Sequence, residues 1–183
     1  MDLTGQILIS IPNMLDERFY KTVIYLCSHS KEGSMGIIIN KKIDHDMYPD
    51  LLEQLGIDKP LKDKKIYIRY GGPLESGRGF VLHSDDIIQK ESLTIDKGIA
   101  LTSTAGIFDN LVRGIGPRVS LLALGYAGWG PGQLDYEIKN NGWMTLHVES
   151  GFIFDEHVSK KWDEAYKLMG VNPLSLTEFS GNA

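Results

Sequence analysis

Cysteine is nearly absent from this chain of 183 residues, which contains only Cys27. A single cysteine excludes an intrachain disulfide and a cysteine-rich metal site. Long apolar runs are also missing, since no segment approaches the roughly 18 residues of a membrane-spanning helix. The N-terminal stretch MDLTGQILIS has neither the basic region nor the long apolar region of a signal peptide. These absences predict a cytoplasmic protein that does not enter a membrane.

The chain has fewer basic residues than acidic ones. The chain has 19 Lys and Arg against 24 Asp and Glu, which gives a formal net charge of -5. Proteins that bind duplex DNA usually carry a basic balance, because they neutralise phosphates. No helix-turn-helix with a basic recognition helix is visible either. We therefore do not expect sequence-specific DNA binding.

The chain also lacks the short motifs of common catalytic and metal sites. There is no G-x-S-x-G turn for a hydrolase nucleophile and no P-loop ending in Gly-Lys-Ser or Gly-Lys-Thr. The histidines do not form HxH, HxxxH or H-E-x-x-H spacings; they are His29, His45, His83, His147 and His157. We predict no metal, no cofactor and no catalytic residue.

What the chain does contain is the pattern of one α+β domain. Its residues are 42% hydrophobic and 23% charged, which is ordinary for a globular protein. Strands and helices do not alternate regularly, so we expect a mixed, mainly antiparallel sheet or partial barrel with a few short helices. We place the domain at 1–176 and a polar, flexible tail at 177–183. The predicted strands are 5–11, 22–28, 35–40, 65–71, 80–84, 92–95, 98–103, 118–126 and 143–149, and the predicted helices are 47–55, 104–113, 131–141 and 156–169.

The stretch GYAGWGPGQLDYEI, residues 125–138, predicts a structural corner rather than a phosphate loop. Its glycines do not follow a nucleotide-binding spacing, and Pro131 lacks the N–H group that an anion would need. We expect Gly130 to cap a helix that begins at Pro131, with Gln133 bonding back to the Gly130 N–H. Trp129 would pack against Leu134.

The stretch RYGGPLESGRGFVLH, residues 69–83, is the richest polar segment. Gly71 and Gly72 could expose backbone N–H groups, Arg78 could bind a carboxylate or phosphate, and His83 ends an apolar strand. This predicts a site for a small anionic ligand. The alternative is a tight turn between strands in which Arg78 pairs with an acidic residue.

A thiol enzyme is a second possibility. Cys27 and His29 are two residues apart on a predicted strand, so both side chains would point the same way and could form a reactive pair. Against this, a lone cysteine in TVIYLCS is most often a small buried hydrophobic residue. His83 is the other residue that such an enzyme could use.

Four motifs in order give the chain a family resemblance. They are GQILISIPNMLDERFYKTVIYLC, GSMGIIINK, YGGPLESGRGFVLH and LGYAGWGPGQLDYEIKNNGWM, and together they span nearly the whole length. With them the chain resembles the AlgH/YqgE family of bacterial proteins, departing at Leu74 and Asp135, where valine and glutamate are familiar.

The resemblance implies a compact α+β domain of mixed topology and no agreed catalytic residues. Family members are labelled transcriptional regulators because of a genetic association with polysaccharide production. Combined with the residues above, this leads us to expect a non-enzymatic binding or regulatory module. Its partner would be a protein or a small anionic ligand, and any control of transcription would be indirect. The alternative is a small cytosolic enzyme that uses Cys27 and His29, or His83.

Overall fold

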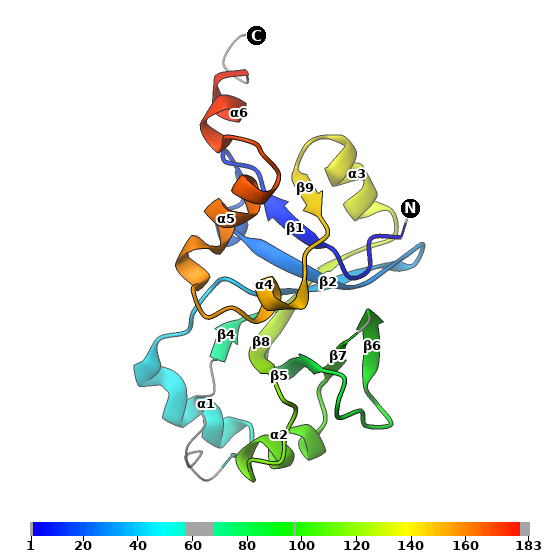
Figure 1. Cartoon of the computed structure of the whole chain (residues 1–183), viewed down its shortest axis with the longest axis vertical. Coiled ribbons are helices and arrows are strands. Elements are labelled where there is room, and N and C mark those ends of the chain that lie inside the picture. The colour runs from blue at the N-terminus through cyan, green and yellow to red at the C-terminus, as the bar shows by residue number, and fades with distance from the viewer. Residues whose placement is uncertain (1, 58–67, 97, 180–183) are drawn as a thin grey trace.

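The structure, a computed structural model, describes residues 2–57, 68–96 and 98–179 (Figure 1). The strands are β1 (Ile7–Ser10), β2 (Val23–Ser30), β3 (Gly33–Ile38), β4 (Ile68–Tyr70), β5 (Leu74–Ser84), β6 (Leu93–Asp96), β7 (Ile99–Thr102), β8 (Ser120–Trp129) and β9 (Trp143–Leu146). The α-helices are α1 (Tyr48–Gln54), α2 (Ala105–Val112), α3 (Gln133–Lys139), α4 (Ser150–Phe154), α5 (Lys161–Leu168) and α6 (Pro173–Phe179). Short 3₁₀ turns lie at Glu17–Phe19, His45–Met47 and Val158–Lys160.

Within the described residues, the strands form one nine-stranded mixed sheet, eight of them in the order β6-β7-β5-β8-β3-β2-β1-β9 and β4 beside β8. All neighbours along this path are antiparallel, and β4 adds a parallel pairing to β8. The long strand β8 joins the two halves, because its first part pairs with β5 and β4 while its last residues pair with β3. The path ends at β6 and β9, so the sheet does not close into a barrel.

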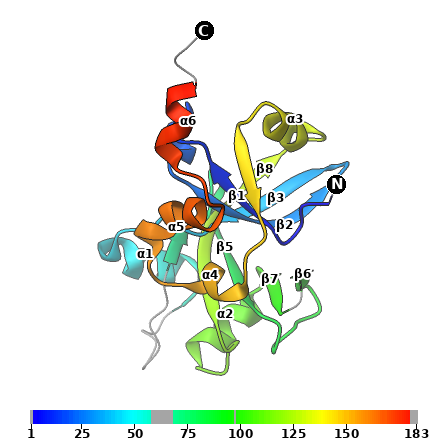
Figure 2. The same cartoon turned by 45° about the horizontal axis from the view of Figure 1, so that its top comes forward.

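Three buried clusters follow from the alternation of side chains along the strands. The central cluster lies between the two halves of the sheet and continues onto α4 and α5; it includes Ile7, Tyr25, Phe80 and Trp162. A second cluster places Leu8, Ile24 and Trp129 against Leu134 of α3. A third places Val81 and Leu122 under α2. Figures 1 and 2 show α3 beside β9, and α1 and α2 at the far end of the molecule from the C-terminus.

The predicted α+β domain with a mainly antiparallel mixed sheet is confirmed. The predicted 65–71 strand corresponds to β4, although residues 65–67 lie outside the described part of the chain. The predicted strand 80–84 starts too late, because Leu74 pairs with Tyr126 and begins β5. The sequence pattern also missed α4, and it extended the last long helix back to residue 156, where the structure has a 3₁₀ turn and then α5.

The polar tail predicted at 177–183 begins inside α6, and residues 180–183 lie outside the described residues. Among the helices of the described chain, none has the length and apolar character needed to cross a bilayer.

Candidate ligand-binding site

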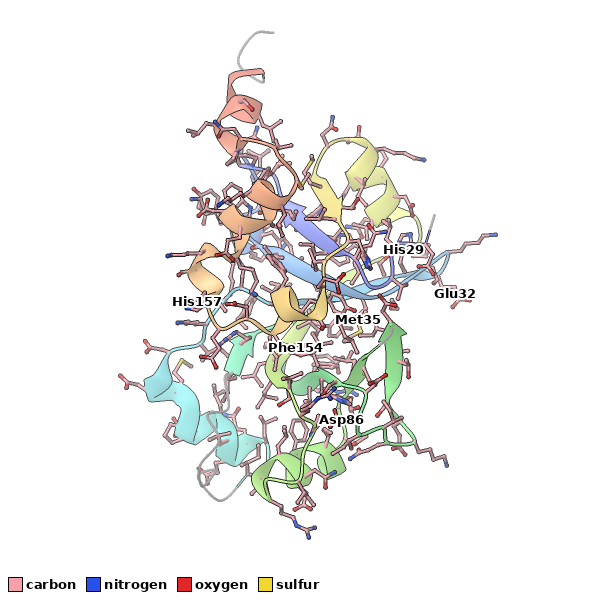
Figure 3. The ribbon with its side chains drawn as sticks, in the orientation of Figure 1. His29, Glu32, Met35, Asp86, Phe154 and His157 are labelled. Carbon is pink, nitrogen blue, oxygen red and sulfur yellow. The ribbon has the colours of Figure 1, made fainter. Side chains whose placement is uncertain are left out.

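Residues from both halves of the sheet line an open pocket of about 700 Å³, which we call the mouth. The side chains that line it come from six strands and the adjoining turns: Ser28 and Ser30 of β2, Met35 of β3, Leu74, Arg78 and Phe80 of β5, Leu93 of β6, Leu101 of β7, Tyr126 and Trp129 of β8, and Glu32, Glu91 and Ser103 in the turns. Ligand sites typically combine apolar side chains with a small number of polar groups. Figure 3 shows Met35 facing the strands β5 to β7, with Glu32 at the end of the β2–β3 hairpin.

An irregularity in β5 shapes one side of the mouth. Leu74 pairs with Tyr126 and Gly79 pairs with Leu124, so the pairing register with β8 shifts between them. Bulged segments of this kind bend a strand and turn its side chains away from the ladder. The intervening residues Glu75 to Arg78 are all exposed, and Glu75 has a positive φ of 45°. The sequence between the two pairings therefore carries polar groups to the rim.

The floor of the mouth is apolar. Phe80 and Leu101 are buried in the central cluster, and the rings of Phe80 and Tyr126 meet edge to face with centroids 5.6 Å apart. Leu74 and Leu93, from β5 and β6, each remain 43% exposed. A ligand that covered these two leucines would remove apolar surface from water, which is favourable at about 25 cal/mol per Å².

Among the described residues that line the mouth, Arg78 is the one base. Its guanidinium lies 5.0 Å from the centroid of the Phe80 ring and donates a 2.8 Å hydrogen bond to Ser103 Oγ. It also forms a 3.4 Å ion pair with Glu75. Of the four residues predicted to bind a ligand, Arg78 alone lines this cavity.

Gly71 and Gly72 lie instead where the chain approaches β8 most closely. The Gly71 N–H donates to the Leu124 carbonyl oxygen at 2.7 Å, and the Gly71 carbonyl accepts from Ile38 at 2.9 Å. A Cβ atom on Gly72 would stand 2.1 Å from the Tyr126 carbonyl carbon. The Gly71 N–H is therefore committed to the sheet, and the two glycines serve close backbone packing.

His83 lies near the other end of β5, fully buried. Its Nδ1 donates to the Ser84 carbonyl oxygen at 2.8 Å, and its Nε2 lies 2.8 Å from Thr102 Oγ1. Burial lowers the pKa of this imidazole below its usual range. Both ring nitrogens are occupied within the fold, away from the mouth.

The expectation that Cys27 and His29 point the same way is wrong. The β2–β3 pairing shifts register between Leu26 and Ser28, which places Cys27 in a bulge. The thiol belongs to the central cluster, and burial raises its pKa to about 12. His29 instead pairs with Ser34, with its Nδ1 2.8 Å from Ser34 Oγ and its Nε2 3.7 Å from Asp135 of α3. The thiol and the imidazole therefore do not form a reactive pair.

The stretch GYAGWGPGQLDYEI forms a corner between β8 and α3, but the predicted helix start is wrong. The helix begins at Gln133, and Gly132 before it has a φ of 70°. The Gln133 N–H donates to the Gly130 carbonyl oxygen at 3.1 Å. Proline followed by glycine at positive φ favours a type II turn over these four residues, which delays the helix.

Several groups at this corner bond to the carboxylate of Glu137. We call Glu137, Trp129, Trp143 and Gln133 the Glu137 corner. Glu137 Oε2 accepts hydrogen bonds from Trp129 Nε1 at 2.9 Å and Trp143 Nε1 at 2.8 Å. Glu137 Oε1 accepts from Gln133 Nε2 at 2.8 Å, while Gln133 Oε1 accepts from the Gly130 N–H at 3.0 Å. The carboxylate thus joins the helix to two strands.

A second groove of about 560 Å³ lies beside the Glu137 corner. It is lined by Met14, Leu15, Phe19 and the two tryptophans, among others. In this groove the Glu137 carboxylate already accepts three hydrogen bonds, and Asp16 is paired with Arg18. Leu74 and Trp129 line both this groove and the mouth.

Several residues of the mouth had no local signal in the sequence. Glu32, Glu91, Leu93 and Ser103 lie on separate elements that only the sheet brings together. Exposed acidic residues in turns are common, so neither glutamate is distinctive by itself. Within the described residues, no group of three or more His, Cys, Asp or Glu side chains is arranged to hold a metal ion.

Comparison with known proteins gives consistent matches over the whole chain. The model of the AlgH-like family matches residues 7–174. A UPF0301 protein from Beijerinckia indica is 44% identical, covering 99% of this chain and 92% of that protein. One from Paracoccus denitrificans is 43% identical, covering 100% and 97%. The solution structure of the AlgH protein from Pseudomonas aeruginosa superposes with a TM-score of 0.80 at 33% identity, covering 100% of this chain and 95% of that one.

Proposed function

The chain belongs to the AlgH-like family, and we propose that it is a non-enzymatic binding module that holds a ligand in the mouth. The observation that carries this proposal is the composition of the mouth. It combines an apolar floor, two leucines that are each 43% exposed, and hydroxyl and carboxylate groups on the rim. Such a mixture binds through apolar burial and uses a few polar groups for orientation.

The candidate catalytic groups support binding over catalysis. The Cys27 thiol is 1% exposed with a raised pKa, so little of the nucleophilic thiolate would form near neutral pH. His83 is enclosed and hydrogen-bonded at both ring nitrogens. Neither group lines the mouth.

We also propose that the module acts in the cytoplasm, and that any influence on transcription passes through a protein partner. The net charge of -5 disfavours direct contact with duplex DNA. Six strands contribute to the lining of the mouth, which would allow contacts with several residues of another polypeptide.

Methyl NMR tests whether the mouth is the binding site. Protein labelled at its leucine and methionine methyl groups is titrated with a library of small fragments and short peptides. We expect ligands to shift Met35, Leu93 and Leu101, which line the mouth and not the second groove, and to leave Met14 and Leu15 of the second groove unchanged. Ligands that shifted only the second groove, or methyl groups scattered over the surface, would contradict the proposal.

A pair of bulky substitutions provides the matched control. Ser30→Trp places a large ring at the mouth, whereas Ser159→Trp places the same ring at an exposed site elsewhere. Binding should be lost in the first variant and kept in the second, with both proteins folded.

A further inference from the structure

The charges that line the mouth are mostly negative. Three glutamates, Glu32, Glu75 and Glu91, face one base, Arg78. Lys31 and Lys90 are neighbours of two of these glutamates in sequence, but they are exposed outside the lining. The mouth therefore has a local excess of negative charge that a bound cation would reduce.

One cation already lies against the floor of the mouth, and it belongs to the chain itself. The Arg78 guanidinium lies over the Phe80 ring, donates to Ser103 and pairs with Glu75. An aromatic face, a hydroxyl and a carboxylate are the groups that commonly hold a guanidinium. The contacts of Arg78 thus show that this surface accommodates a planar cation.

The other two carboxylates are uncommitted. Among the described residues, neither Glu32 nor Glu91 takes part in an ion pair, and both are exposed. They lie on different elements, one in the β2–β3 turn and one just before β6. Two acidic groups so placed can meet positive charges at separate positions along one ligand.

The apolar part of the site is divided in the same way. Leu74 comes from β5 and Leu93 from the edge strand β6, and the floor residue Leu101 lies on β7, between these two strands in the sheet order. A ligand that covers both leucines and reaches both glutamates contacts β5, β6 and the β2–β3 turn, and it must present apolar and basic groups together.

Resting on the proposed function, we infer that the ligand of the mouth is an extended segment of a partner protein in which arginine or lysine residues stand next to apolar residues. Its apolar side chains cover Leu74 and Leu93, and its basic side chains meet Glu32 and Glu91. Arg78 competes with these cations for the floor. The sequence led us to expect a small anionic ligand, whereas this inference assigns the ligand a positive charge.

Fluorescence polarisation with a labelled ten-residue peptide of alternating leucine and arginine tests the inference. A peptide of alternating leucine and glutamate is the comparison. The double variant Glu32→Gln/Glu91→Gln should weaken binding of the leucine-arginine peptide by roughly 3- to 10-fold, as expected for two exposed ion pairs. The double variant Glu149→Gln/Glu156→Gln makes the same change of net charge at exposed sites outside the mouth and should alter binding less than about 2-fold.

The variant Arg78→Gln should change the affinity for the leucine-arginine peptide in the opposite direction. Removing the competing cation should tighten binding of the leucine-arginine peptide by about 2- to 5-fold, the size of an exposed charge interaction. If Arg78→Gln weakened binding, and the leucine-glutamate peptide bound better than the leucine-arginine peptide, the ligand would be anionic. The inference would then fail while the mouth remained a binding site.

Two further outcomes distinguish a failure of this inference from a failure of the proposed function. If octylamine displaced the labelled leucine-arginine peptide at equal concentration, the ligand would be a small amine, and the inference of a protein segment would be overturned. If no variant of the mouth changed the binding of either peptide, and Ser30→Trp also had no effect, the proposed function itself would fail.

Discussion

The Glu137 corner and the mouth contain carboxylates in opposite situations. Glu137 accepts hydrogen bonds from two indole N–H groups and one side-chain amide, all at 2.8 to 2.9 Å. Glu32 and Glu91 form no ion pair with any described residue. The exposure of the apolar side chains differs as well. Trp129 is 7% and Trp143 4% exposed, whereas Leu74 and Leu93 are each 43% exposed.

This contrast separates residues that hold the fold from residues that are available to a ligand. A buried polar group contributes to stability when its hydrogen bonds are made, and it costs free energy when they are lost. An exposed carboxylate contributes little to stability and keeps its charge for a partner. Substitutions at the corner should therefore change stability, and substitutions at the mouth should change binding.

Trp129→Ala should produce the largest change. It removes a ring packed edge to face on Trp143 with centroids 6.0 Å apart, and it removes one donor to Glu137. Truncating a buried aromatic side chain costs about 3–5 kcal/mol of unfolding free energy. Urea denaturation followed by circular dichroism measures this loss.

Tyr136→Ala is the control for that variant. Tyr136 is also an aromatic residue near the corner, but it is 69% exposed on α3, so its loss should cost less than about 0.5 kcal/mol. Because Trp129 also lines the mouth, its effect on stability decides the comparison: if Trp129→Ala kept full stability, the corner would not hold the fold.

Much of the sheet could be predicted from the sequence because its strands have local signals. Segment 22–28 is rich in β-branched and aromatic residues, and the short Gly33 turn after it predicts the hairpin that β2 and β3 form. The start of α3 could not be predicted as well, because the proline that can begin a helix here lies in a turn. Pro131 lies in a turn and not in the helix because Gly132 follows it, and the φ of 70° at Gly132 suits that turn.

The site was harder to predict because it is not contiguous. The stretch Gly71–His83 contains the four residues that were predicted to bind a ligand. In the structure, Arg78 lies at the mouth, whereas His83 is buried near the other end of β5. The register shift that places Cys27 in a bulge has no signature in TVIYLCS. Such features depend on pairing between distant strands, which the pattern of one segment does not contain.

Glu137→Gln should produce an intermediate change. The amide keeps the shape of the side chain but has one acceptor oxygen instead of two, so either the indole groups or the Gln133 amide would face a donor. Losing a charge-assisted hydrogen bond at a partly buried site costs about 1–3 kcal/mol. The same urea experiment measures it, and Glu149→Gln at an exposed site serves as the control.

Glu32→Gln and Glu91→Gln should produce the smallest changes. Since neither carboxylate has an ion pair among the described residues, each substitution should alter the unfolding free energy by less than about 0.5 kcal/mol. Thermal melts of each variant beside Glu137→Gln compare the same chemical change in the two regions. A loss above about 1 kcal/mol at either position would mean that the mouth carboxylates hold the fold as Glu137 does. A stable protein with altered peptide binding is the result that assigns their charge to a partner.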